Sequence, residues 1–225
     1  MTQFNQSRVP VPTLGRLATY LRVLMELERA HVETVSSAEM ERQTGINAAQ
    51  FRKDLSYFGE FGKPGVGYTV VDLQDRITRI LKIDRRQPVI LVGAGNLGSA
   101  LVGYPGFLEN QMELVAVFDN SAAKVGTVIH NLTIQDFRNV QELNQQLQAR
   151  IAILAVPAAG VQRVADDLVQ SGIKAILNFA PATLKVPEDI VVRNVSFMQE
   201  LAVLSYHTSS RLLVADTMPP TARKL

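Results

Sequence analysis

The pattern of apolar and polar residues along the chain changes near residue 87. Before this point, apolar residues recur every three or four positions, which is typical of amphipathic helices. After it, short apolar runs alternate with helical patterns, which is typical of a doubly wound parallel sheet of the Rossmann type. We therefore predict an α/β protein with two domains, at residues 1–86 and 87–196, followed by a C-terminal helix and tail at 197–225.

The first predicted helix begins at Thr13, whose hydroxyl can cap it, and runs to about Arg29. Its apolar residues lie three or four positions apart and define one face. This face consists of Leu14, Leu17, Ala18, Leu21, Leu24 and Met25.

Two shorter helices follow. Ser36 and Glu39 have the spacing of a capping box, which predicts a helix from there to Thr44. Gly45 breaks this helix, and Asn47 caps the next one. Helices joined by so tight a turn indicate a helix-turn-helix unit.

Glycines dominate the next segment, EFGKPGVGYTV at 60–70. Glycine turns followed by the alternating residues Tyr68, Val70 and Leu73 predict a hairpin. A hairpin after three helices indicates a winged helix. Residues 75–86 then have the pattern of a linker helix.

The second half contains five short apolar runs, which predict buried parallel strands. They lie at 89–92, 113–118, 151–156, 174–179 and 189–195. Helical patterns separate the runs, and a last helix is expected at about 197–214.

Composition excludes several kinds of site. The chain of 225 residues has no cysteine, which rules out disulfides and thiolate metal sites. Its histidines, His31, His130 and His207, lack metal-ligand spacing, so no metal is expected. The N-terminus lacks the apolar core of a signal peptide, and the longest apolar run is too short to span a bilayer. These features predict a soluble cytoplasmic protein without a membrane segment.

The predicted helix at 48–58 has two unlike faces. Ala48, Phe51, Leu55 and Phe58 gather on one side, while Ala49, Arg52, Lys53 and Ser56 gather on the other. Such a division suits a recognition helix in a major groove about 12 Å wide. Arg52 is suited to guanine, whereas Lys53, Ser56 and Tyr57 suit phosphates. The alternative is an amphipathic helix with a solvated polar face.

A possible dinucleotide site follows the first strand of the second domain. Gly93, Gly95 and Gly98 form G-x-G-x-x-G between an apolar strand and a helix that starts near Asn96. The glycines permit a tight turn, an approach of the backbone to pyrophosphate, and close helix packing. Asp119 ends the next strand, 21 residues after Gly98, where an acid accepts from the ribose 2′-hydroxyl and favours NAD(H) over NADP(H).

A dehydrogenase also needs an acid–base residue near the nicotinamide. The predicted strand ends offer no such residue and instead carry Pro157, Ala158, Asn178, Phe179, Ala180 and Pro181. This absence argues for a sensor rather than an enzyme. A small NAD-dependent oxidoreductase with an accessory domain and a regulator that binds coenzyme A remain as alternatives.

The motifs RKDLSYFG (52–59), GVGY (65–68), YPGF (104–107), KVG (124–126) and LNFAP (177–181) resemble those of the redox-sensing transcriptional repressor Rex family. The resemblance implies a homodimer that binds palindromic operator DNA through winged helices and NADH or NAD through Rossmann domains. It also implies that the C-terminal helix is exchanged between subunits, and that NADH releases the protein from DNA.

The resemblance implies the following functional residues. The cofactor residues are Gly93, Ala94, Gly95, Asn96, Leu97, Gly98, Asp119, Lys124, Pro157, Asn178, Phe179, Ala180 and Pro181. The polar face of the 48–58 helix and the glycine-rich wing, rather than the resemblance, predict the DNA-binding residues, which are Arg52, Lys53, Ser56, Tyr57 and, in the wing, Lys63, Gly65 and Tyr68. Arg16 and Tyr104 belong to a switch that in the family includes an aspartate, where this chain has Ser196.

Overall fold

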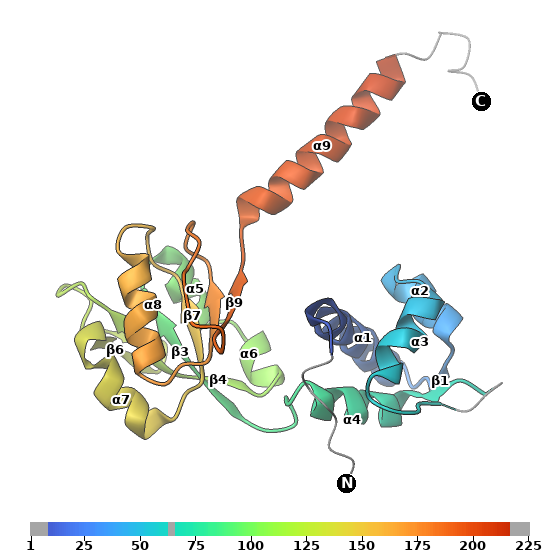
Figure 1. The fold of residues 1–225 in the computed structure, drawn as a ribbon, viewed down its shortest axis with the longest axis horizontal. Coiled ribbons are helices and arrows are strands. Elements are labelled where there is room, and N and C mark those ends of the chain that lie inside the picture. The colour runs from blue at the N-terminus through green and yellow to red at the C-terminus, as the bar shows by residue number, and fades with distance from the viewer. Residues whose placement is uncertain (1–8, 63–65, 217–225) are drawn as a thin grey trace. The chain divides into compact units, whose positions relative to one another are not determined.

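The computed structural model describes residues 9–62 and 66–216. The chain divides into two compact units, Met1–Arg86 and Gln87–Leu225 (Figure 1). Each unit has its own core of buried apolar side chains.

Among the described residues, the first unit contains four helices and a two-stranded sheet. The helices are α1 (Val11–Arg29), α2 (Ser37–Thr44), α3 (Ala48–Ser56) and α4 (Val70–Ile80). Strand β1 (Thr34–Val35) pairs antiparallel with β2 (Tyr68–Thr69).

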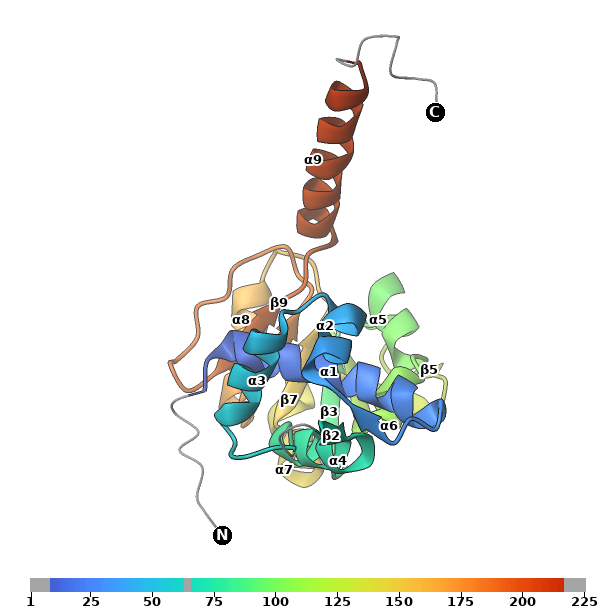
Figure 2. The same cartoon turned by 90° about the vertical axis from the view of Figure 1, so that its right-hand side faces the viewer.

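Helices α2 and α3 form the helix-turn-helix (Figure 2). Each of them begins at a capping side chain. The Ser36 hydroxyl accepts the N–H of Glu39 at 3.0 Å, and the Asn47 side chain accepts the N–H of Ala49 at 2.8 Å. Between the helices, Gly45 takes a left-handed conformation with φ of 71°. The predicted capping residues of both helices are confirmed.

The predictions for α1 are partly wrong. Its N-cap is Pro10 rather than Thr13, because Pro12 is tolerated in the first turn, where its missing N–H needs no partner. Leu14 and Ala18 are exposed, although their spacing predicts that both lie on the apolar face. The buried face instead includes Thr13 and Tyr20, because α1 packs against several elements rather than one.

The predicted hairpin is also wrong in its pairing. Strand β2 pairs with β1, which precedes the helix-turn-helix, and Val70 and Leu73 lie in α4. Val70, Leu73 and Ile77 are all buried at a spacing of three and four residues, which is the period of a helix. Helix α4 therefore begins five residues before the predicted start at 75 and ends at Ile80, not 86.

The second unit is built on a seven-stranded sheet in the order β5-β6-β4-β3-β7-β8-β9. All neighbours are parallel except β5 and β6. The strands are β3 (Gln87–Val92), β4 (Met112–Asp119), β5 (Val128–Ile129), β6 (Leu132–Asp136), β7 (Ile151–Leu154), β8 (Ala175–Asn178) and β9 (Val191–Asn194). The five predicted strands and the doubly wound fold class are confirmed, whereas β5 and β6 were missed.

Helices cover both faces of this sheet. The helices α7 (Val140–Leu147) and α8 (Val161–Gln170) share one apolar cluster with Ile90 and Phe118 of the sheet. On the other face, α5 (Asn96–Val102) and α6 (Gly106–Glu109) pack on a cluster that includes Leu91. Successive residues of β3 alternate between the two clusters, as expected for a strand covered on both sides.

Two parts of this unit remain exposed. Strand β9 was predicted to be buried, but it is an edge strand and Val191 is exposed. Helix α9 (Phe197–Asp216) has exposed apolar side chains at Phe197, Met198, Leu201, Val203, Leu204 and Tyr206. In the described ranges, no helix combines the length and apolarity needed to cross a membrane.

Candidate functional site

The glycines of the loop after β3 have different structural roles. Gly93 has a φ of 103°, and a Cβ there would lie 2.4 Å from the carbonyl oxygen of Ala155. A Cβ at Gly98 would lie 1.8 Å from the carbonyl oxygen of Gly93. At Gly95, a Cβ would meet nothing within 4 Å. Packing therefore requires two glycines, while Gly95 leaves the backbone accessible to a ligand.

A cavity of about 420 Å³ opens beside this loop. It lies at the carboxyl ends of β3, β4 and β7, where the strand order reverses, which is the usual ligand site in open α/β sheets. Its lining includes Gly93, Gly95, Asp119, Asn120, Ser121, Lys124, Phe137, Pro157 and Val164. Ala94, Asn96, Leu97 and Gly98 do not contribute to this lining.

Asp119 holds its carboxylate at the edge of the cavity. It accepts the N–H groups of Ala94 and Ser121, both at 2.8 Å, and the Lys124 ammonium at 3.2 Å. Burial by itself raises the pKa of Asp119, but these hydrogen bonds and the Lys124 charge outweigh burial, so the pKa lies below its usual value. Asp119 is therefore ionised at neutral pH. Ala94 is also predicted to contact a cofactor. Its backbone N–H is not available for this contact, because it donates to Asp119.

Phe179, Ala180 and Pro181 line a second cavity, of about 560 Å³. Ser196 and the first residues of α9 form its other side, and the rings of Phe179 and Phe197 lie 6.3 Å apart. The described lining contains no ionisable side chain.

Asn178 does not line this second cavity, but its side chain holds residues that do. Its side chain is fully buried, and its Nδ2 donates to the carbonyl of Ala182 at 3.0 Å and to Oδ1 of Asn194 at 2.8 Å. Its Oδ1 accepts the N–H of Ala180 at 3.0 Å. The side chain was predicted to contact a cofactor, but its polar atoms are used to shape the turn that follows β8.

The polar face of α3 is exposed at Arg52, Lys53 and Ser56, as its pattern predicts. Nη1 of Arg52 donates to the Ser37 hydroxyl at 2.7 Å, which links α3 to the start of α2. The Ser56 hydroxyl donates to the carbonyl of Lys53 at 2.7 Å, so its donor is already used within the helix. Tyr57, directly after α3, is half-buried.

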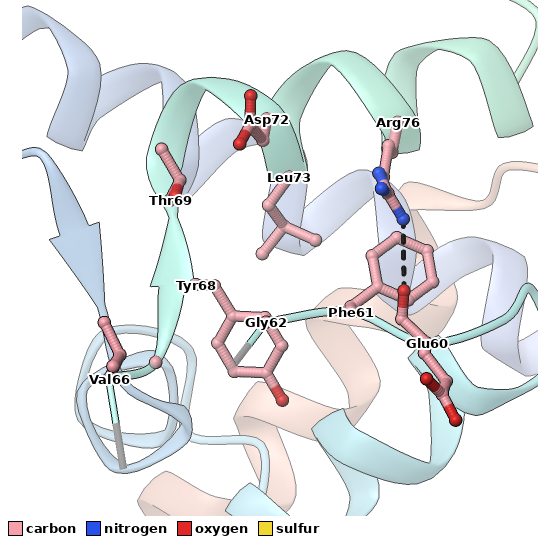
Figure 3. Close-up of a pocket in the computed structure, with 10 residues that line it drawn as sticks. Glu60, Phe61, Gly62, Val66, Tyr68, Thr69, Asp72, Leu73 and Arg76 are labelled. Carbon is pink, nitrogen blue, oxygen red and sulfur yellow. Dashed lines mark hydrogen bonds between the residues drawn. The ribbon is translucent and has the colours of Figure 1, made fainter. Parts of the chain in front are cut away.

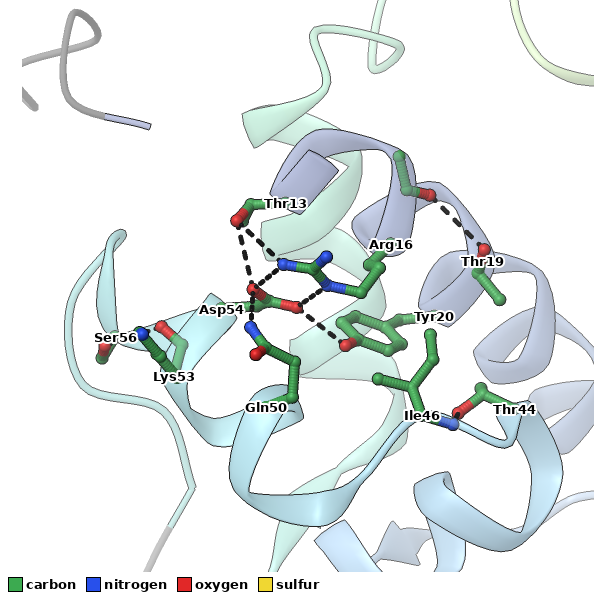
Figure 4. Close-up of polar contacts among 11 residues, drawn as sticks. Thr13, Arg16, Thr19, Tyr20, Thr44, Ile46, Gln50, Lys53, Asp54 and Ser56 are labelled. Atoms are coloured by element: carbon green, nitrogen blue, oxygen red, sulfur yellow. Dashed lines mark hydrogen bonds and ion pairs between the residues drawn. The ribbon is translucent and has the colours of Figure 1, made fainter. Parts of the chain in front are cut away.

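The opposite face of α3 contains a polar residue that the pattern of apolar residues did not identify. Asp54 is fully buried, and side chains from α1 and α3 surround its carboxylate (Figure 4). Arg16 donates from Nε at 2.6 Å and from Nη2 at 2.7 Å, and the Tyr20 hydroxyl donates at 2.9 Å. Thr13 at 3.1 Å and Gln50 at 2.8 Å complete this Asp54 cluster.

The segment after α3 packs on α4 (Figure 3). The Arg76 guanidinium lies 5.2 Å from the centre of the Phe61 ring, and its Nη1 donates to the carbonyl of Glu60 at 3.1 Å. The ring of Tyr68 meets that of Phe51 edge-on at 5.3 Å, which ties β2 to α3. Lys63 and Gly65, predicted for the wing, lie outside the described residues.

The three predicted switch residues have the following surroundings. Arg16 belongs to the Asp54 cluster. Tyr104 is exposed and packs edge-on against Phe107, with ring centres 5.3 Å apart. The Ser196 hydroxyl accepts the N–H of Gln199 at 3.3 Å, at the start of α9.

Within the described ranges, no group of three histidine or carboxylate side chains is arranged to hold a metal ion.

Two family models match the chain. The model described as a putative DNA-binding protein N-terminus covers residues 8–56, and the CoA binding domain model covers residues 84–182. These ranges correspond to the helix-turn-helix and to most of the sheet unit.

Similar proteins match nearly the whole chain. A redox-sensing transcriptional repressor Rex from Chloroflexus aggregans is 46% identical over 88% of this chain and 93% of that protein. The solved structure of RSP in complex with beta-NADH covers 94% of this chain and 99% of RSP, with a TM-score of 0.85 and 34% identity. RSP in complex with beta-NAD+ and operator DNA covers 92% of this chain and 96% of RSP, with a TM-score of 0.86 and 36% identity. The chain therefore belongs to the Rex family of redox-sensing transcriptional repressors.

Proposed function

We infer that this protein represses transcription under the control of the NADH/NAD+ ratio, binding operator DNA when NADH is low and leaving it when NADH binds. The observation that carries this function is the presence, in one chain, of a helix-turn-helix with an exposed cationic face and a Rossmann unit with a ligand cavity. RSP, its structural relative, binds NADH in one structure and NAD+ with operator DNA in another. The relatives are repressors, and this chain is assigned as a regulator, not an enzyme.

The residues of the first cavity fit the adenosine half of NAD(H). The exposed backbone at Gly95 suits a pyrophosphate, because no side chain blocks its approach. Asp119 retains acceptor capacity for a ribose hydroxyl, since a carboxylate has about four lone-pair sites. Phe137, Pro157 and Val164 supply apolar surface for an adenine ring.

The second cavity fits the nicotinamide half. Phe179 and Pro181 supply an apolar wall, and the described lining offers no acid or base to act on a substrate. A bound nicotinamide ring is therefore sensed rather than used in turnover. This feature disfavours the oxidoreductase alternative.

We assign DNA binding to the exposed face of α3. Arg52 suits a base edge, because its fork can bond guanine bidentately, whereas Lys53 suits a phosphate. Tyr57 directly follows α3, and the Tyr68 ring in β2 meets Phe51 of α3, so both tyrosines are proposed to contact the DNA backbone. Ser56 must exchange its helix hydrogen bond to donate to DNA.

The protein is proposed to act as a homodimer on a palindromic site in the cytoplasm, where bacterial operators lie. Helix α9 carries the surface that suits dimerisation, because its exposed apolar side chains lie on consecutive turns. A two-fold dimer presents two α3 helices to two half-sites.

Titration of NADH into the free protein and into the protein–operator complex tests the function. The probe is a palindromic duplex selected by the wild-type protein from a random library. We expect operator to weaken NADH binding by the same factor by which NADH weakens operator binding, which is typically about 5–150-fold. NAD+, NADPH and coenzyme A serve as competitors. Unchanged NADH affinity in the presence of operator, or stronger competition by coenzyme A than by NAD+, contradicts the proposal.

A further inference from the structure

We propose that the Asp54 cluster positions the recognition helix, and that Arg16 acts in DNA recognition through Asp54 rather than by touching DNA or by locking the NADH-bound state. Arg16 is thus a positioning residue for Arg52 and Lys53. This inference rests on the proposed DNA-binding function of α3.

The cluster connects the two helices at a fully buried point. Thr13, Tyr20 and Asp54 have no exposed surface, and Arg16 closes the cluster with a side chain that is 27% exposed. Three of the residues that donate to Asp54 come from α1, while Gln50 comes from the preceding turn of α3. The cluster therefore ties the rotation of α3 about its own axis to α1.

This rotation determines where the DNA-facing side chains point. On a helix with about 100° per residue, Asp54 is directed about 200° from Arg52 and about 100° from Lys53. Apolar contacts of Phe51 and Leu55 are non-directional and tolerate small rotations. Bidentate hydrogen bonds between Arg16 and Asp54 are directional, so they set the angle at which Arg52 leaves the helix.

The charge of Asp54 holds Arg16 in the cluster and opposes its pairing with another group. Burial raises the pKa of Asp54, but hydrogen bonds from Arg16, Tyr20 and the other donors outweigh burial, and the pKa lies below its usual value. The carboxylate is therefore charged, and a partner that removed Arg16 would leave a buried anion without its cation. Ser196 has no carboxylate to offer Arg16 in exchange.

The test compares Arg16→Gln, Asp54→Asn and the double variant with the control Lys174→Gln. Lys174 lies in the second unit, outside the lining of both cavities, and both it and its ion-pair partner Asp189 are exposed. The measurement is the ratio of affinities for the selected operator and for a scrambled duplex of equal length, over a series of salt concentrations. NADH affinity with and without operator is measured on the same proteins.

We expect Arg16→Gln and Asp54→Asn each to reduce this ratio by roughly tenfold, a loss similar to that of one mismatched base pair. The double variant should be no worse than the single ones, because both act through one cluster. Lys174→Gln should leave the ratio unchanged. The factor by which NADH lowers operator affinity should remain that of the wild type in every variant.

Several results would overturn the proposal. A lower salt slope with an unchanged ratio in Arg16→Gln would mean that Arg16 contacts phosphate. A changed NADH coupling factor with an unchanged ratio would place Arg16 in the switch. A lower melting temperature with no loss of discrimination would mean a purely structural role. If Asp54→Asn does not fold, Tyr20→Phe provides the milder test, since it removes one hydrogen bond to Asp54 and keeps the ring. An unchanged affinity ratio in both Tyr20→Phe and Arg16→Gln also overturns the proposal.

The wild-type protein separates this inference from the proposed function. If it does not distinguish any palindromic duplex from its scrambled form, the DNA-binding function itself fails. If it does, and Arg16→Gln discriminates equally well, only the positioning role fails.

Discussion

The guanidinium of Arg16 donates two hydrogen bonds to the carboxylate of Asp54, from Nε to Oδ2 at 2.6 Å and from Nη2 to Oδ1 at 2.7 Å. This bidentate pair joins α1 to α3. Asp54 is fully buried, so its charge depends on these donors, and the consequences can be measured in stability as well as in DNA binding.

Arg16→Met is expected to lower the free energy of unfolding of the first unit by about 2–3 kcal/mol. Breaking a buried pair costs about 3–5 kcal/mol, and the partial exposure of Arg16 reduces this value. Urea unfolding followed by circular dichroism provides the measurement. Arg22→Met is the control, because its exposed pair with Glu26 is worth at most about 1 kcal/mol. Equal losses for the two variants would contradict the prediction.

Stability is expected to fall at acid pH. The pKa of Asp54 and the pKa of Asp119 are both lower in the folded protein than the ordinary value of 3.8. A lowered pKa stabilises the fold above the unfolded pKa, and this contribution is lost as the pH falls through the folded pKa. The free energy of unfolding should therefore decline below about pH 4. In Asp54→Asn the decline should be shallower, and an identical pH profile would show that Asp54 does not contribute.

Gly95→Ala is expected to weaken NADH binding, whereas Gly98→Ala is expected to lower the stability of the fold. A Cβ at Gly95 meets open space, so the variant should keep the wild-type melting temperature and lose NADH affinity. A Cβ at Gly98 collides with the Gly93 carbonyl, which should cost about 1–3 kcal/mol of stability. Calorimetric unfolding and NADH titration distinguish the two. Wild-type NADH binding by Gly95→Ala would place the pyrophosphate elsewhere.

Asp119→Asn is expected to narrow the preference for NADH over NADPH. The substitution removes the carboxylate that repels a 2′-phosphate and leaves the Lys124 ammonium without its anion. NADH should bind more weakly and NADPH more tightly, as measured by isothermal titration. The matched control Asp189→Asn removes an exposed ion pair with Lys174 outside the cavity lining and should change neither affinity.

Leu204→Glu is expected to shift the protein from dimer to monomer. The residue lies on the exposed apolar surface of α9, where a buried charge would oppose association. Sedimentation at several concentrations reports the state, and operator affinity should fall in parallel. Val128→Glu is the control, since Val128 is equally exposed but lies on β5. Dimers of unchanged stability would exclude α9 from the interface.

Local sequence determined the parts of this protein that depend on short-range chemistry. The Ser36 and Asn47 caps and the turn at Gly45 follow from hydrogen bonds and backbone angles within a few residues. The glycine loop and the Asp119 position are also local, since both follow directly from a strand end. For the same reason, the two-faced character of α3 could be predicted from Arg52, Lys53, Phe51 and Leu55.

Only the tertiary structure decided the residues whose partners lie far away in the sequence. Asp54 appears in a polar–apolar pattern as an ordinary charged residue, yet Arg16, 38 positions earlier, makes it part of the core. Strand β2 pairs with β1 across the intervening helices, and the buried amide of Asn178 reaches Asn194. Periodicity reports which face of one segment is apolar, whereas a buried charge or amide is tolerated only where folding supplies its hydrogen-bond partners.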